Sequence, residues 1–145
     1  MEKMTREELS WVLYDVGNSA FVLVMVTALM PIFFKDVAAA GMSGVESTAN
    51  WGFANSAASL ILALLAPVLG AMADYQGRKK RFFLFFLGLG LVFTLFLTFV
   101  GRGQWLFCLL LFVIARVGWA GANIFYDAFL ADVTTRQRMD LISAR

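Results

Sequence analysis

The stretch SAFVLVMVTALMPIFF, residues 19–34, contains no charged residue, and it belongs to a longer uncharged run at 16–34. Three further apolar runs follow it, and only the last of them carries charges. A helix needs about 20 apolar residues to cross the hydrocarbon core of a bilayer. In lipid every backbone polar group must be satisfied within its own segment, so continuous runs of this length predict helices. The three further runs lie at 51–73, 82–100 and 105–129.

The composition excludes an ordinary soluble domain. Of the 145 residues, 61% are apolar and only 15% are charged, and the mean hydropathy is +0.77. A soluble domain is closer to half apolar and a quarter charged. Fifteen phenylalanines cannot be hidden in a small soluble fold, because small domains leave much of their surface exposed. We therefore predict an all-α membrane protein with four transmembrane helices.

Charge placement predicts the orientation of these helices. We expect spans at about 12–34, 51–73, 82–100 and 105–130, in a single transmembrane domain covering 1–145. The head, the turn at 74–81 and the tail hold nine Lys and Arg residues, whereas the opposite side holds Lys35 and Arg102. Lys and Arg accumulate on the cytoplasmic side, so both termini are predicted to be cytoplasmic. The connection at 35–50 is then expected to be an external loop.

An alternative for the first run is a signal peptide, because VAAAG at 37–41 resembles a cleavage site. The run is longer than a usual signal core and follows an acidic head, so a retained span is favoured.

Polar residues inside the predicted spans define possible cavity positions. Arg116, Asn123 and Asp127 are spaced by seven and four, which places them on one helix face. Polar groups at membrane depth normally face a cavity or a partner. Tyr-Asp dipeptides at 14–15 and 126–127 stand at the inner ends of oppositely directed helices, as in an inverted repeat. The predicted cavity residues are Asp15, Asn18, Asn55, Arg116, Asn123 and Asp127.

Two readings remain open for these charges. Arg116 lies near the middle of its span, where it either lines a cavity or pairs with a carboxylate elsewhere. Asp15 and Asp127 either belong to the cavity, where they could relay protons, or lie in water at the membrane interface.

The stretch GAMADYQGRKKRFF, residues 70–83, forms the turn between the second and third spans. Gly77 can supply the positive φ that a short turn often needs. The four cations at 78–81 would fix topology and meet anionic lipid headgroups. That explanation requires neither Asp74 nor the two glycines, Gly70 and Gly77.

The pattern Gly70-x-x-x-Asp74-x-x-Gly77-Arg78-Lys79 resembles the loop between the second and third helices of the major facilitator superfamily. RVGWAGAN at 116–123 partly resembles a second motif of that superfamily. LYDVGNSAF, PIFF, the run at 51–81 and NIFYDAFLADV are similar to the branch that contains the vacuolar amino-acid effluxers linked to autophagy. The chain departs from the superfamily patterns at Tyr75, where a basic residue is more usual, and at Trp119, which replaces a Gln.

This resemblance implies a transporter of twelve helices in two six-helix halves, working by alternating access on a small solute, with amino-acid efflux the best-known activity of the branch. It implies a cytoplasmic latch formed by Gly70, Asp74, Gly77, Arg78 and Lys79, in which Asp74 holds one half against the other, and places Arg116 in the central cavity. The expected partners are the lipid bilayer, a small solute and a coupling proton or ion. The expected location is the plasma or inner membrane of a bacterium, or the vacuolar membrane of a fungus.

Four helices cannot form two halves, so the chain is expected to be the N-terminal part of a six-helix half and to need the missing C-terminal helices or another copy. The rival hypothesis is a small four-helix membrane scaffold or assembly partner without transport activity. No cofactor, metal site, nucleic acid or enzymatic activity is expected, since the chain has no histidine and a single cysteine, Cys108.

Overall fold

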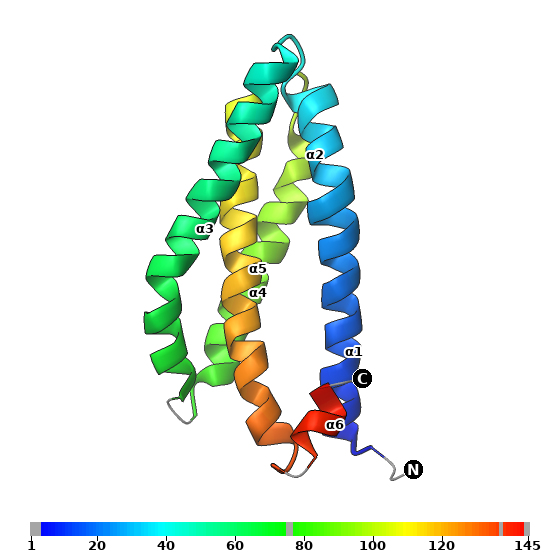
Figure 1. The fold of residues 1–145 in the computed structure, drawn as a ribbon, viewed down its shortest axis with the longest axis vertical. Coiled ribbons are helices and arrows are strands. Elements are labelled where there is room, and N and C mark those ends of the chain that lie inside the picture. Colours follow the sequence, from blue (N-terminus) through cyan, green and yellow to red (C-terminus); the bar gives the residue numbers. More distant parts are fainter. Residues whose placement is uncertain (1–3, 75–76, 137, 144–145) are drawn as a thin grey trace.

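The computed structural model describes residues 4–74, 77–136 and 138–143. Within these residues it contains helices and turns and no strand, which confirms the all-α prediction. Four helical segments are long and apolar enough to cross a membrane, namely Arg6–Ala38, Gly44–Asp74, Lys79–Phe99 and Trp105–Val133 (Figure 1). Their elements are α1 (Arg6–Phe21), η1 (Val22–Leu29), α2 (Met30–Phe33), η2 (Phe34–Ala38), α3 (Gly44–Asp74), α4 (Lys79–Phe96), η3 (Leu97–Phe99), α5 (Trp105–Val133) and the short α6 (Met139–Ser143).

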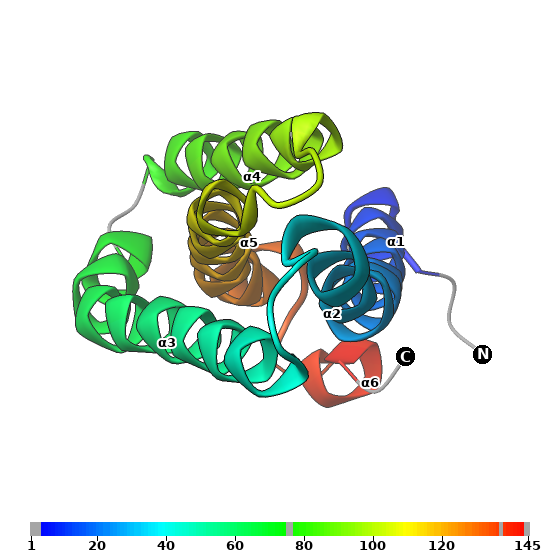
Figure 2. The same ribbon diagram turned by 90° about the horizontal axis from the view of Figure 1, so that it is seen from above.

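Helix α5 lies at the centre of the bundle, with α4 and α3 against it and the first segment beside it (Figure 2). The approach of α4 to α5 is closest at their glycines. A Cβ atom on Gly118 would lie 2.5 Å from the backbone nitrogen of Gly90, and one on Gly121 would lie 2.5 Å from the Phe86 ring. Small residues allow helix backbones to approach in lipid, so these glycines set the α4–α5 contact.

The first segment is a continuous helix with widened turns in its middle. A capping box starts it, since the Thr5 hydroxyl accepts from the Glu8 N–H and the Glu8 carboxylate accepts from the Thr5 N–H. The turns of η1 are π-helical and run directly into α2, which contains Pro31. Proline lacks an N–H and clashes with the carbonyl four residues earlier, which gives a physical reason for wider turns at this place.

The predicted bounds of the loop at 35–50 are wrong, because most of these residues are helical. The first segment stays helical through Ala38, and α3 begins at Gly44. The sequence signal for this early start is a second capping box, in which the Ser43 hydroxyl accepts from the Glu46 N–H at 3.2 Å and Glu46 Oε2 accepts from the Ser43 N–H at 3.1 Å. Hydropathy marks where apolar residues end, and these helices continue beyond that point.

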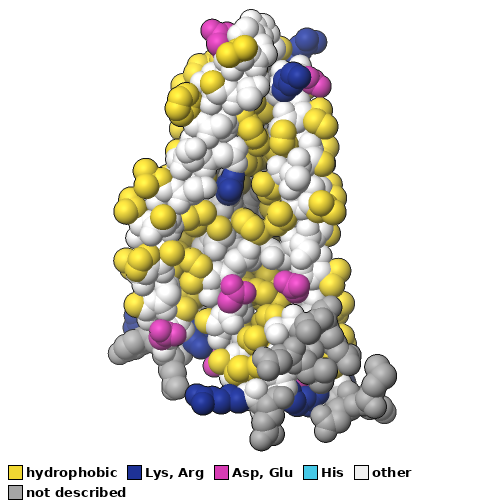
Figure 3. All heavy atoms as spheres, viewed as in Figure 1, with side chains coloured by type: hydrophobic (Ala, Val, Ile, Leu, Met, Phe, Trp, Pro, Cys, Tyr) yellow, Lys and Arg dark blue, Asp and Glu magenta, His cyan; other side chains and the backbone are white. Residues whose placement is uncertain are grey.

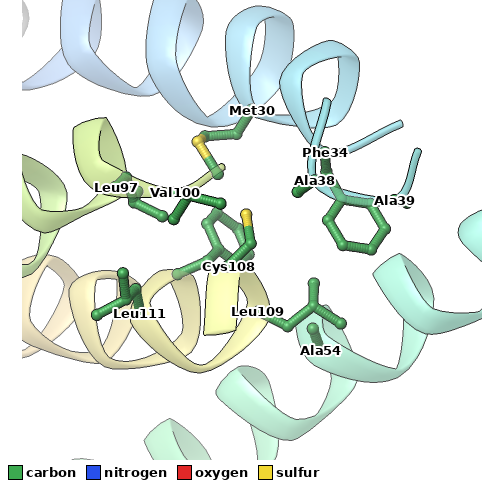
Figure 4. Close-up of a cluster of buried hydrophobic side chains, with 11 residues drawn as sticks. Met30, Phe34, Ala38, Ala39, Ala54, Leu97, Val100, Cys108, Leu109 and Leu111 are labelled. Carbon is green, nitrogen blue, oxygen red and sulfur yellow. The ribbon is translucent and has the colours of Figure 1, made fainter. Parts of the chain in front are cut away.

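Two buried clusters hold the helices together. The first joins all four long segments at the end away from the basic turn, and Phe34 and Cys108 are among its most buried members (Figure 4). The second, at the other end, centres on Leu69, Ala73 and Phe125, with partly buried neighbours from α3, α4 and α5. Helix α1 contributes to neither cluster, so its attachment to the bundle depends on other contacts.

Candidate functional site: the basic turn and the face between α1, α3 and α5

The basic turn has the backbone that its glycine predicts. Helix α3 ends at Asp74, Gly77 adopts a φ of 94°, and α4 begins at Lys79. An L side chain rarely adopts that φ, so Gly77 is needed for the chain to reverse here. Gly70 lies one helical turn before Asp74, and a Cβ atom there would meet nothing within 4 Å. Tyr75 lies outside the described residues.

Only one of the predicted latch side chains has a partner in the described part of the chain. Lys79 donates to the Asp132 carboxylate of α5 at 2.9 Å and to the Ala128 carbonyl at 3.4 Å. Asp74 and Arg78 are exposed. Asp132 is not among the residues predicted from the sequence, although it lies in the motif NIFYDAFLADV at 123–133, because its pairing depends on how α4 is placed against α5.

Arg116 and Asn55, from α5 and α3, are brought together. The Arg116 guanidinium donates through Nη1 to Asn55 Oδ1, and Asn55 Nδ2 donates to the Trp51 carbonyl at 2.9 Å. The surface between α3 and the first segment carries many hydrophobic side chains, with a basic side chain near its middle and acidic side chains closer to the end with the basic turn (Figure 3). Of the two readings left open for Arg116, pairing with a carboxylate finds no support among the described residues.

The two Tyr-Asp dipeptides lie side by side on α1 and α5. The rings of Tyr14 and Tyr126 are 4.5 Å apart, so the two dipeptides face one another across the α1–α5 contact. Asp127 is exposed and Asp15 is half-buried. The mirrored positions in sequence thus correspond to neighbouring positions in the bundle.

Long side chains bridge α1 to α5 where their backbones make few contacts. The Trp11 indole donates to the Tyr126 carbonyl at 3.3 Å, and the Tyr126 hydroxyl donates to the Trp11 carbonyl at 2.9 Å. Further along the helix, the Trp119 indole donates to Asn18 Oδ1 at 2.6 Å. Asn18 and Trp119 border a crevice of about 320 Å³ between α1, α4 and α5. Trp119 therefore holds a predicted cavity residue.

A further bridge from α1, to the residues just after α5, is centred on Glu8, which was not among the residues predicted from the sequence. This carboxylate is 2% exposed and accepts from the Thr134 hydroxyl at 2.8 Å and from Arg138 Nη2 at 3.1 Å. Its sequence signal is the Thr-x-x-Glu capping box. Glu8 thereby ties the start of α1 to the segment that follows α5.

Asn123 is the remaining predicted cavity residue. Its side-chain oxygen is buried and has no hydrogen-bond partner in the described part of the chain. Among the described residues, no hydrogen bond joins the Asn123 oxygen to Arg116 or Asn55. That the polar residues of these three helices line one solute pathway stays a prediction.

Comparison with known proteins decides the family. Residues 44–139 match the family model described as "Vacuole effluxer Atg22 like". The chain belongs to this Atg22-like family. It is also 48% identical over 146 residues to the uncharacterized MFS-type transporter YxiO of Bacillus subtilis (strain 168), an alignment that covers all of this chain and 34% of that protein. No solved structure matches the chain.

Membership of the Atg22-like family confirms the resemblance to the major facilitator superfamily, and together with the four apolar helices it establishes an integral, multi-pass membrane protein. The family is one of transporters and not a class of enzymes. The chain spans about a third of the length of the curated relative that it matches. The described residues contain no group of three metal-binding side chains.

Proposed function

We propose that this chain is the N-terminal part of an alternating-access permease that moves a small solute, with amino acids as the first class to test. Its basic turn faces the cytoplasm and acts as a latch against the other half. Family membership supports transport, and the four apolar helices provide the first spans of a larger bundle. The contacts of the turn support the latch.

The observation that carries the latch is the contrast between Lys79 and Asp74. Lys79 is 15% exposed and is held by Asp132 within this part of the bundle. Asp74, at the end of α3, is exposed and has no hydrogen bond or ion pair with the described residues. Its carboxylate is therefore available for a charge-assisted contact with another part of the permease. A contact made in one state and lost in the other shifts the balance between states.

Asp74→Asn in the complete permease tests the latch. We expect a lower maximal rate of transport of labelled amino acids into proteoliposomes, at an unchanged amount of protein. We also expect faster trypsin cleavage at residues 78–81 in inside-out vesicles, because a weakened latch exposes the basic turn. Asp36→Asn, an exposed acid at the opposite end, serves as the control. Wild-type transport rates and cleavage rates in Asp74→Asn would remove the latch role.

A further inference from the structure

We propose that Asn55 is a positioning residue that holds the Arg116 guanidinium ready to bind a carboxylate of the transported solute. This inference rests on the permease function proposed above and adds a chemical class of solute. It is carried by three observations: the depth of Arg116, the way Asn55 is itself fixed, and the absence of an acidic partner among the described residues.

The first observation is depth. Arg116 lies eleven residues after Trp105, the first residue of α5. At 1.5 Å per residue that is roughly 16 Å along the helix, near the middle of a bilayer core about 30 Å thick. A charged side chain at this depth is costly unless it faces a partner or water. The guanidinium is too far from both ends of α5 to reach the membrane surface.

The second observation is that Asn55 has one orientation. Its Nδ2 donates to the Trp51 carbonyl one turn earlier, so its Oδ1 is the atom presented to Arg116. Trp51 is in turn packed between aromatic neighbours, with its ring centroid 4.5 Å from Phe112 and 5.5 Å from Phe34. Asn55 is therefore a fixed acceptor on a rigid part of α3, and it draws the guanidinium towards the face between α3 and α5.

The third observation concerns charge. An amide is neutral, so Asn55 satisfies one N–H of Arg116 and leaves its positive charge uncompensated. No carboxylate of the described residues forms an ion pair with Arg116; the pairs found there are Lys79–Asp132 and Arg138–Glu8. On its other side Arg116 borders an apolar cavity of about 20 Å³, lined by residues such as Met25, Met30 and Phe112. That cavity offers no anion.

A guanidinium has five N–H donors arranged as a fork that fits a carboxylate with two parallel hydrogen bonds. With one donor engaged by Asn55, Arg116 retains enough donors for that geometry. A carboxylate at this place comes either from the solute or from an acidic side chain elsewhere in the permease. We assign it to the solute, because a fixed cation with no ion-pair partner among the described residues suits a ligand that arrives and leaves.

The experiment changes the charge beside Arg116 with little change in shape. In Asn55→Asp the new carboxylate pairs with Arg116 and competes with the solute. Solute binding to the purified complete permease is measured as the rise in its melting temperature. The solutes are a panel of L-amino acids and the matching amino-acid amides, which lack the carboxylate. We expect wild-type protein to respond to the acids and not to the amides.

For Asn55→Asp we expect a thermal stability equal to or above that of the wild type, together with at least a tenfold rise in the half-saturating concentration of the acid. Asn55→Ala keeps the positive charge of Arg116 but removes the side chain that positions it. We therefore expect a smaller rise in the half-saturating concentration of the acid, with the preference for acid over amide retained. The control is Asn50→Asp, on the same helix, whose side chain contacts Met42. We expect this control to bind as the wild type does.

A role for Asn55 in stability alone would give Asn55→Ala a lower melting temperature and an unchanged half-saturating concentration of the acid, and that result would overturn the proposal. So would a wild-type protein with no carboxylate-dependent response, or normal binding of the acids by Asn55→Asp. If Arg116 instead pairs with an acidic residue elsewhere in the permease, solute binding will not depend on the solute carboxylate and Arg116→Gln will be less stable than the wild type. That result would also overturn the proposal. Transport of neutral solutes alone would refute the carboxylate site and leave the permease function standing.

Discussion

Replacing Gly118 by alanine is the sharpest test of the packing between α4 and α5. A Cβ atom at this position would lie 2.5 Å from the Gly90 nitrogen and 2.9 Å from both the Gly90 Cα and the Phe86 carbonyl oxygen. Ordinary van der Waals contact begins near 3.4 Å. All three atoms belong to the backbone, so no side chain can rotate away. The two helices must separate by about 0.9 Å, the difference between 3.4 Å and 2.5 Å.

The size of the effect follows from a comparison with Gly88→Ala on α4. A Cβ atom on Gly88 would meet nothing within 4 Å. Both substitutions gain the same helix propensity, about 1 kcal/mol for alanine over glycine, and this gain cancels in the comparison. Overpacking costs about 1–3 kcal/mol. We expect the free energy of unfolding of Gly118→Ala to be lower than that of Gly88→Ala by about this amount.

The assay is unfolding of the purified protein by SDS in mixed micelles, followed by tryptophan fluorescence. Gly121→Ala provides an intermediate case, because its Cβ atom would meet the side chain of Phe86, which can move. The expected order of stability is Gly88→Ala, then Gly121→Ala, then Gly118→Ala. Equal stability of Gly118→Ala and Gly88→Ala would refute the close approach of α4 to α5.

Three further outcomes are expected. Glu8→Gln weakens the bond from Arg138 and loosens α1, so it should speed proteolysis of the N-terminal segment, whereas the exposed neighbour Glu7→Gln should not. Trp119→Phe removes the bond to Asn18, so it should increase hydrogen exchange in α1 more than in α4, and equal exchange in both helices would contradict this bridge. Lys80→Cys should react with an impermeant maleimide only from the cytoplasmic side and Arg102→Cys only from outside, against the background of the buried Cys108; the reverse pattern would invert the proposed topology.

The basic turn shows how far local sequence reasoning reaches. The positive φ of Gly77 follows from the shortness of the connection and is confirmed. The partner of Lys79 does not follow from the turn, because Asp132 lies more than fifty residues away in the chain. Glu7 and Glu8 likewise look equivalent in a charge count, yet one is exposed and the other is buried beneath Thr134 and Arg138.

The sequence by itself determined that the helices lie in lipid, how many of them are long enough to span it, and the family. Hydropathy and short motifs are properties of neighbouring residues, so they can be read without the tertiary structure. The helix ends were partly visible in the capping boxes at Thr5 and Ser43. Only the tertiary structure decided that Arg116 meets an amide and that Asn18 meets Trp119. Which side chains meet depends on the rotation and register of each helix, and the close approach of backbones at Gly90 and Gly118 fixes these for α4 and α5.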